Sequence, residues 1–112
     1  MKIRQREIGD VVVLDVNGKI MGGPDSEAFQ ATIDALVELG KRKVLVNLEN
    51  VSWINSTGLG ILIAGFSSLQ KSGGKLKLVN VSQRIESLLA VTKLSTIFES
   101  FRQEDEAVRS FA

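Results

Sequence analysis

Two neighbouring hydroxyl side chains, Ser56 and Thr57, are the groups in this 112-residue sequence whose setting points most clearly to chemistry. They lie in the stretch WINSTGLG, which begins at Trp53, and no charged residue falls between Glu49 and Lys71. Apolar residues recur at helical spacing after this stretch, so the hydroxyls are expected at the first turn of a helix. Backbone N–H groups lack partners there and carry partial positive charge, which favours a phosphate group.

Three roles are open for this polar junction. In the first, Asn55 or Ser56 only caps the helix, which stabilises it by about 1 kcal/mol. In the second, the helix start binds a phosphate ligand, although the chain has neither of the usual glycine-rich phosphate motifs. In the third, Ser56 itself is phosphorylated, which adds about −1.5 to −2 charges to an uncharged surface.

The helix expected over residues 57–71 has two contrasting faces. One stripe supplies the core: Leu59, Leu62, Ile63, Phe66 and Leu69. The opposite stripe is small or apolar and carries no charge: Gly58, Ile61, Gly65, Ser68 and Ser72. Either another helix of the same domain covers this second stripe, or a partner protein docks on it. In the second case, a phosphate on Ser56 would impose a desolvation cost on the partner and repel it.

Composition excludes several classes of function. The chain has no Cys and no His, which rules out disulfides and Ser-His or Cys-His catalysis and argues against zinc. Lys and Arg total 14 and Asp and Glu total 13, a balance that argues against a nucleic-acid surface. An enzyme would have to rely on Asp25 and Lys19, and neither has a convincing partner. We therefore expect a non-enzymatic protein without cofactor or metal.

No targeting segment is recognisable in the first residues, which lack an apolar signal region. The uncharged stretch in the middle contains too many polar residues for a membrane span. The expected location is the cytoplasm.

Strands and helices alternate along the chain and must position the junction. Strands are expected at residues 3–8, 11–16, 44–48 and 75–79. Helices are expected from Pro24 to Gly40, over 57–71, after Ser82 with Ile85, Leu88 and Leu89 facing inward, and over 104–111. Ile97–Phe98 is expected to be a short strand or a packed corner. A Gly9-Asp10 turn makes the first strand pair antiparallel. This order, ββαβαβα followed by a short segment and a helix, predicts one α/β domain over residues 1–112 with a mixed sheet of four or five strands. Two loops, Met21–Ser26 and Val51–Thr57, are expected side by side at one sheet edge.

The central residues resemble a known family. Asn47-Leu48-Glu49 and the run from Val51 to Gly60 are similar to the signature of STAS domains and, more narrowly, of bacterial anti-sigma factor antagonists. The length, the order of elements, the Gly18 turn and the Gly73-Gly74 break resemble that family as well.

The resemblance implies a partner-switching function. An unphosphorylated antagonist binds an anti-sigma factor that is also a serine kinase of the GHKL type, and a sigma factor is released. The kinase then phosphorylates the serine directly before Ser/Thr-Gly, here Ser56, and the complex dissociates until a PP2C-type phosphatase resets it. For the reasons of charge and composition given above, we expect no nucleic-acid or membrane partner and no cofactor, and the expected state is a monomer or weak dimer.

Partner contacts are expected at the two loops and on the uncharged helix face: Met21, Gly22, Gly23, Asn55, Ser56, Thr57, Gly58, Gly60 and Ile61. Two departures from the family pattern affect this site. Asn55 stands where the family often has Asp, and Gly18-Lys19-Ile20-Met21 stands where it often has Gly-Glu-hydrophobic-Asp. The alternative function is a constitutive STAS scaffold, or an accessory subunit of a stress-signalling assembly or a transport ATPase.

Overall fold

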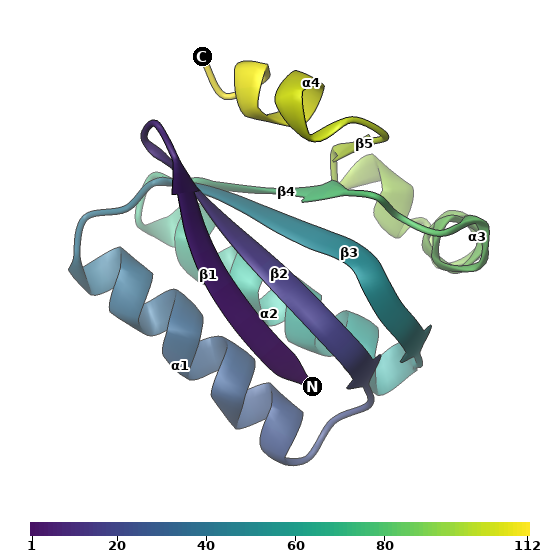
Figure 1. The fold of residues 1–112 in the computed structure, drawn as a ribbon. Coiled ribbons are helices and arrows are strands. Elements are labelled where there is room, and N and C mark those ends of the chain that lie inside the picture. Colours follow the sequence, from purple (N-terminus) through teal and green to yellow (C-terminus); the bar gives the residue numbers. More distant parts are fainter.

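Five strands form one mixed sheet in the computed structural model, which describes residues 1–112, in the order β1-β2-β3-β4-β5. The elements are β1 (Lys2–Ile8), β2 (Val11–Ile20), α1 (Pro24–Glu38), β3 (Lys43–Ile54), α2 (Ser56–Lys71), β4 (Lys75–Val79), α3 (Gln83–Val91), the 3₁₀ turn η1 (Leu94–Thr96), β5 (Ser100–Phe101) and α4 (Glu104–Arg109). Only β1 and β2 are antiparallel. The predicted α/β fold is therefore confirmed, and α1 and α2 lie on one face of the sheet and α4 on the other (Figure 1).

Alternating side chains in β2 divide the core between the two faces. The face toward α1 and α2 belongs to a cluster of 21 buried residues that includes Val12, Leu14 and Val16. The other face belongs to a smaller cluster: Val11, Val13, Leu45, Val79 and Ala107. Because both faces are buried, β2 is a nearly continuous apolar run, as the sequence pattern indicates.

Strands β2 and β3 are longer than the sequence predicts. β2 does not end at Asn17-Gly18, because the β2–β3 pairing shifts register on both sides of this pair and Gly18 adopts a φ of 95° within the strand. β3 does not end at Leu48 but runs to Ile54. The polar residues beyond Leu48 occupy exposed positions, while Val51 and Ile54 are buried. The predicted loop from Val51 to Thr57 is therefore wrong, and Asn55 alone connects β3 to α2.

The chain end also differs in detail from the prediction. Of the two alternatives for Ile97–Phe98, the packed corner is confirmed: Phe98 is buried, and its ring packs edge-on against Phe66 with centroids 5.3 Å apart. The last strand is the two-residue β5, and α4 stops at Arg109 instead of Phe111. None of the helices combines the length and the apolar character needed to cross a bilayer.

Candidate functional site

At the polar junction between β3 and α2, Asn55 and Ser56 occupy different positions at the start of the helix. Asn55 is the N-cap: its Oδ1 accepts a hydrogen bond from the Gly58 N–H at 2.8 Å, and its carbonyl accepts one from the Leu59 N–H at 2.9 Å. Ser56 is the first helical residue, is exposed, and takes no part in the cap. The capping role thus belongs to Asn55, which leaves the Ser56 hydroxyl accessible for chemistry.

The loop between β2 and α1 lies against the start of α2, as the shared sheet edge predicts. Gly22 has a φ of 109°, and a Cβ placed on it would lie 2.7 Å from Thr57 Cγ2. Its neighbour Met21 keeps 45% of its surface exposed although it is a large apolar residue. Gly22 thus brings this loop against Thr57, the residue after Ser56, and its neighbours Met21 and Gly23 are exposed.

The two residues considered for catalysis are not brought together as an acid–base pair. The Asp25 carboxylate accepts a hydrogen bond from the Met21 N–H at 3.3 Å and forms an ion pair with the N-terminal amino group of Met1 at 3.4 Å. Lys19 is exposed on β2, in register with Trp53 of β3. Asp25 is thus an anchor for the loop.

The uncharged helix face expected to bind a partner is covered by this chain itself. A Cβ on Gly58 would lie 2.0 Å from the Ile20 carbonyl oxygen, and one on Gly65 would lie 2.5 Å from Phe29 Cε2 of α1. Ile61 is only 4% exposed. The prediction that Gly58 and Ile61 contact a partner is therefore wrong, because these small or apolar residues let α2 pack closely on β2 and α1.

A different stripe of α2 is exposed and also uncharged. It consists of Ser56, Gly60, Ala64 and Ser67, which we call the α2 stripe. These residues follow one another at intervals of three or four and therefore share one face of the helix. A Cβ on Gly60 would meet nothing within 4 Å, which shows that the stripe is open. Of the predicted contact residues on the helix, Ser56, Thr57 and Gly60 are accessible.

A groove beside Ser56 was missed by sequence reasoning. It has a volume of about 420 Å³ and lies between the β3–α2 junction and α3; its lining residues are Trp53, Ile54, Asn55, Ser56, Arg84, Ser87, Leu88 and Val91. The Arg84 guanidinium carbon lies 3.7 Å from the centroid of the Trp53 ring. Val91 is 81% exposed, and Leu88, expected in the core, is half-buried at this groove. Arg84, Leu88 and Val91 are four and three residues apart, and this helical spacing could have indicated that they share a second face of α3.

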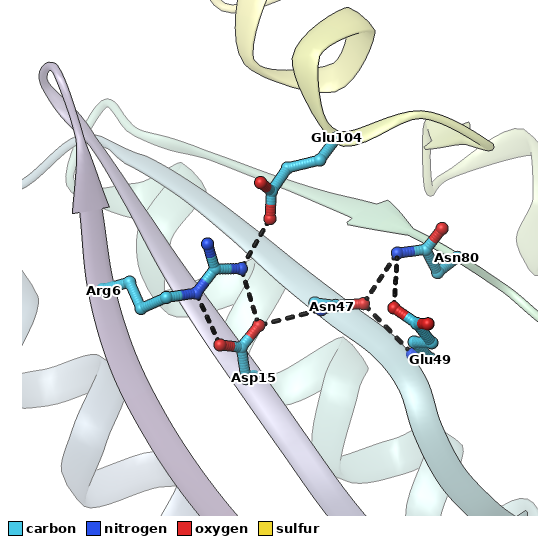
Figure 2. Close-up of polar contacts among 6 residues, drawn as sticks. All are labelled: Arg6, Asp15, Asn47, Glu49, Asn80 and Glu104. Carbon is cyan, nitrogen blue, oxygen red and sulfur yellow. Dashed lines mark hydrogen bonds and ion pairs between the residues drawn. The ribbon is translucent and has the colours of Figure 1, made fainter.

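Charged side chains with displaced pKa values lie on the other sheet face, away from the α2 core (Figure 2). Arg6 Nε donates to Asp15 Oδ2 at 2.6 Å, and Asn47 Nδ2 donates to Asp15 Oδ1 at 2.8 Å. These hydrogen bonds, the one from Arg6 above all, hold the pKa of Asp15 below its usual range. Arg6 also pairs with Glu104 of α4, so this network fastens α4 to the sheet.

Comparisons with known proteins agree with this geometry. Residues 2–107 match the family profile of the STAS domain. The chain is 31% identical over 97 residues to an anti-sigma-B factor antagonist of Bacillus subtilis, covering 85% of this chain and 89% of that protein. It is 40% identical over 58 residues to the Staphylococcus aureus protein of the same name, covering 52% and 54%. The crystal structure of a Thermotoga maritima protein provisionally assigned as an anti-sigma factor antagonist superposes with a TM-score of 0.87 and 26% identity, covering 96% and 92%.

Proposed function

The chain belongs to the STAS domain family, among the anti-sigma factor antagonists, and from this premise we propose that it is a phosphorylation-controlled partner switch in the cytoplasm. Anti-sigma factor antagonists are non-enzymatic STAS proteins, so the chemistry of the switch is supplied by other proteins. The unphosphorylated chain, a monomer or weak dimer, binds an anti-sigma factor that is a GHKL-type serine kinase and thereby releases a sigma factor. Phosphorylation of Ser56 ends the binding, and a PP2C-type phosphatase restores it.

The accessibility of the Ser56 hydroxyl is the observation that carries this proposal. Asn55 caps α2, so Ser56 can react without loss of the cap. In the reaction, Ser56 Oγ forms a bond to the γ-phosphorus of ATP, ADP leaves with the electrons of the broken P–O bond, and the hydroxyl proton passes to a base of the kinase or to water. Each turnover therefore changes this chain only at one oxygen.

The surroundings of Ser56 explain why one phosphate would prevent docking. The α2 stripe carries no charge, and the loop at Met21 and Gly22 adjoins it. A partner that covers this surface must remove water from it. A group with about −1.5 to −2 charges in that position either stays solvated and prevents closure or loses its water at a large cost.

The experiment is phosphorylation by the cognate kinase and ATP, followed by intact-mass measurement and site mapping. We expect one added phosphoryl group on the native chain and on Thr57→Ala, the matched control, and none on Ser56→Ala. Ser56→Ala should still bind the kinase, whereas Ser56→Asp should bind at least tenfold more weakly, a change of about 1.4 kcal/mol. Phosphate found only at other residues would refute the site. A complex that is unaffected by Ser56→Asp would indicate the constitutive scaffold instead.

A further inference from the structure

The groove beside Ser56 contains one formal charge. Arg84 is the only charged residue among its eight lining residues, and none of the seven salt bridges of the chain includes it. The nearest acid on its own helix, Glu86, lines a different depression together with Arg102. The groove therefore presents an uncompensated cation, and its natural complement is an anion.

The position of Arg84 leaves its hydrogen-bond donors available. Its guanidinium carbon lies 3.7 Å from the centroid of the Trp53 ring, a cation–π distance, and none of its N–H groups forms a hydrogen bond within the chain. The N–H groups of a guanidinium lie in its plane and point outward, in a fork that matches two oxygens of a phosphate or carboxylate. Trp53 thus holds the cation at the groove wall while its edge stays free.

Ser56 is the one lining residue that the proposed function converts into an anion. It borders the same groove as Arg84, from the start of α2, while Arg84 comes from the first turn of α3. A phosphate on Ser56 would be tethered to the chain, so its effective concentration at Arg84 far exceeds that of a free anion. At neutral pH it also carries more charge than a single carboxylate of a partner.

We propose that Arg84 is the intramolecular binding partner of phosphorylated Ser56, and that it draws the phosphate into the groove between α2 and α3. This inference rests on the proposed function and adds a residue and a surface to it. In the unphosphorylated chain the groove is open, with Leu88 and Val91 accessible. In the phosphorylated chain the phosphate occupies the groove next to Trp53, so the switch changes this surface as well as the α2 stripe.

The test uses phosphoserine placed at position 56 during synthesis through a reassigned codon, so it needs no kinase. The ³¹P NMR shift is followed through a pH titration for the otherwise native chain, for Arg84→Gln and for the matched control Arg102→Gln. A cation in contact with the phosphate favours its dianion, so the second pKa of the phosphate should be lower by about 0.5 or more in the native chain than in Arg84→Gln. Arg102→Gln should titrate like the native chain, and added salt should reduce the difference.

Identical titrations of the native chain and Arg84→Gln, with folding of both verified by circular dichroism, would overturn the proposal. It would also be overturned if Arg84→Gln weakened binding of the unphosphorylated chain to the kinase while it left the titration unchanged, since Arg84 would then be a partner contact. Failure of the proposed function is recognised separately. A cognate kinase that never modifies Ser56 refutes the switch, whereas the installed phosphoserine still measures what Arg84 binds.

Discussion

Asn55 and Ser56 are neighbours, yet only Asn55 takes part in the cap of α2. The cap is made by the neutral amide oxygen of Asn55, so no formal charge lies at the start of α2 in the unphosphorylated chain. The family often has Asp at this position, which would add a negative charge before any modification. With Asn55, the proposed phosphorylation of Ser56 would add about −1.5 to −2 charges to a junction that has no formal charge of its own. A negative charge at the start of α2 would then come from the modification alone.

Substitutions of Asn55 should separate capping from charge. Asn55→Ala removes the hydrogen bond to Gly58 N–H, and we expect it to lower the free energy of unfolding by about 1 kcal/mol. Asn55→Asp keeps a cap and adds an anion at the positive end of the helix, so it should raise that free energy by about 0.3–1 kcal/mol. Urea denaturation at neutral pH and low salt measures both. An Asn55→Ala chain as stable as the native one would show that the cap contributes nothing.

Glycines in α2 determine how closely this element packs on its neighbours. Gly58 and Gly65 lie where any Cβ would collide with β2 or α1, whereas Gly60 faces open space. Glycines in one helix thus serve two purposes: Gly58 and Gly65 allow close packing inside, and Gly60 contributes to a surface without bulky or charged side chains. The neighbours of α2 distinguish them: the end of β2 covers Gly58, α1 covers Gly65, and nothing covers Gly60.

Alanine substitutions at two of these glycines should have opposite effects on stability. Gly58→Ala places a Cβ 2.0 Å from the Ile20 carbonyl oxygen, a backbone atom that cannot move without distorting β2. We expect it to cost about 3 kcal/mol or more in unfolding free energy. Gly60→Ala has room for its methyl group and gains helix propensity, so it should stabilise the chain by up to about 1 kcal/mol. Chemical denaturation of the two variants checks both values; equal losses would contradict the assigned packing.

The sequence predicted best those elements whose pattern can be recognised from their own residues, without knowledge of the neighbouring elements. A run of β-branched residues identified β2, and the residues Gly40 and Ser82 marked helix limits, because these signals need no tertiary partner. The end of β3 was missed, since polar residues at its exposed positions resemble a loop until the neighbouring strand is known.

The candidate site was predicted in part for the same reason. Ser56 and its loop neighbour Gly22 follow from local order and sheet topology. The covered stripe with Gly58 and Gly65 and the open stripe with Gly60 are both uncharged and rich in small residues, so the sequence could not say which of them the rest of the chain covers. The groove at Arg84 depends on how α3 lies relative to β3, which no local pattern encodes.

On the scale of the whole molecule, α4 lies on the sheet face opposite α1 and α2 (Figure 1). It packs there on the smaller apolar cluster, and polar contacts join the chain end to the strands. Lys77, only 5% exposed, donates to the carbonyl oxygen and to Oγ of Ser110, both at 3.0 Å. Its ammonium group also lies 4.6 Å from the centroid of the Phe111 ring. Arg6 adds its pairs with Asp15 and Glu104 (Figure 2). This face therefore depends on ion pairs that respond to pH.

The Asp15 carboxylate should make stability fall in acid. Its pKa is lower in the folded chain than in the unfolded one, so its contribution is complete above about pH 4 and disappears as the pH falls through the folded pKa. Asp15→Asn should therefore lower the free energy of unfolding by about 1.5 kcal/mol near neutral pH, and the difference from the native chain should shrink toward about pH 3. Asp10→Asn is the matched control: its pKa is also lowered, by Lys43, but the pair is exposed and its smaller effect should vanish in salt. Urea denaturation across this pH range tests the prediction. If Asp15→Asn lowered the free energy of unfolding by the same amount at every pH, Asp15 would have the same pKa in the folded and unfolded states, and the prediction would be wrong.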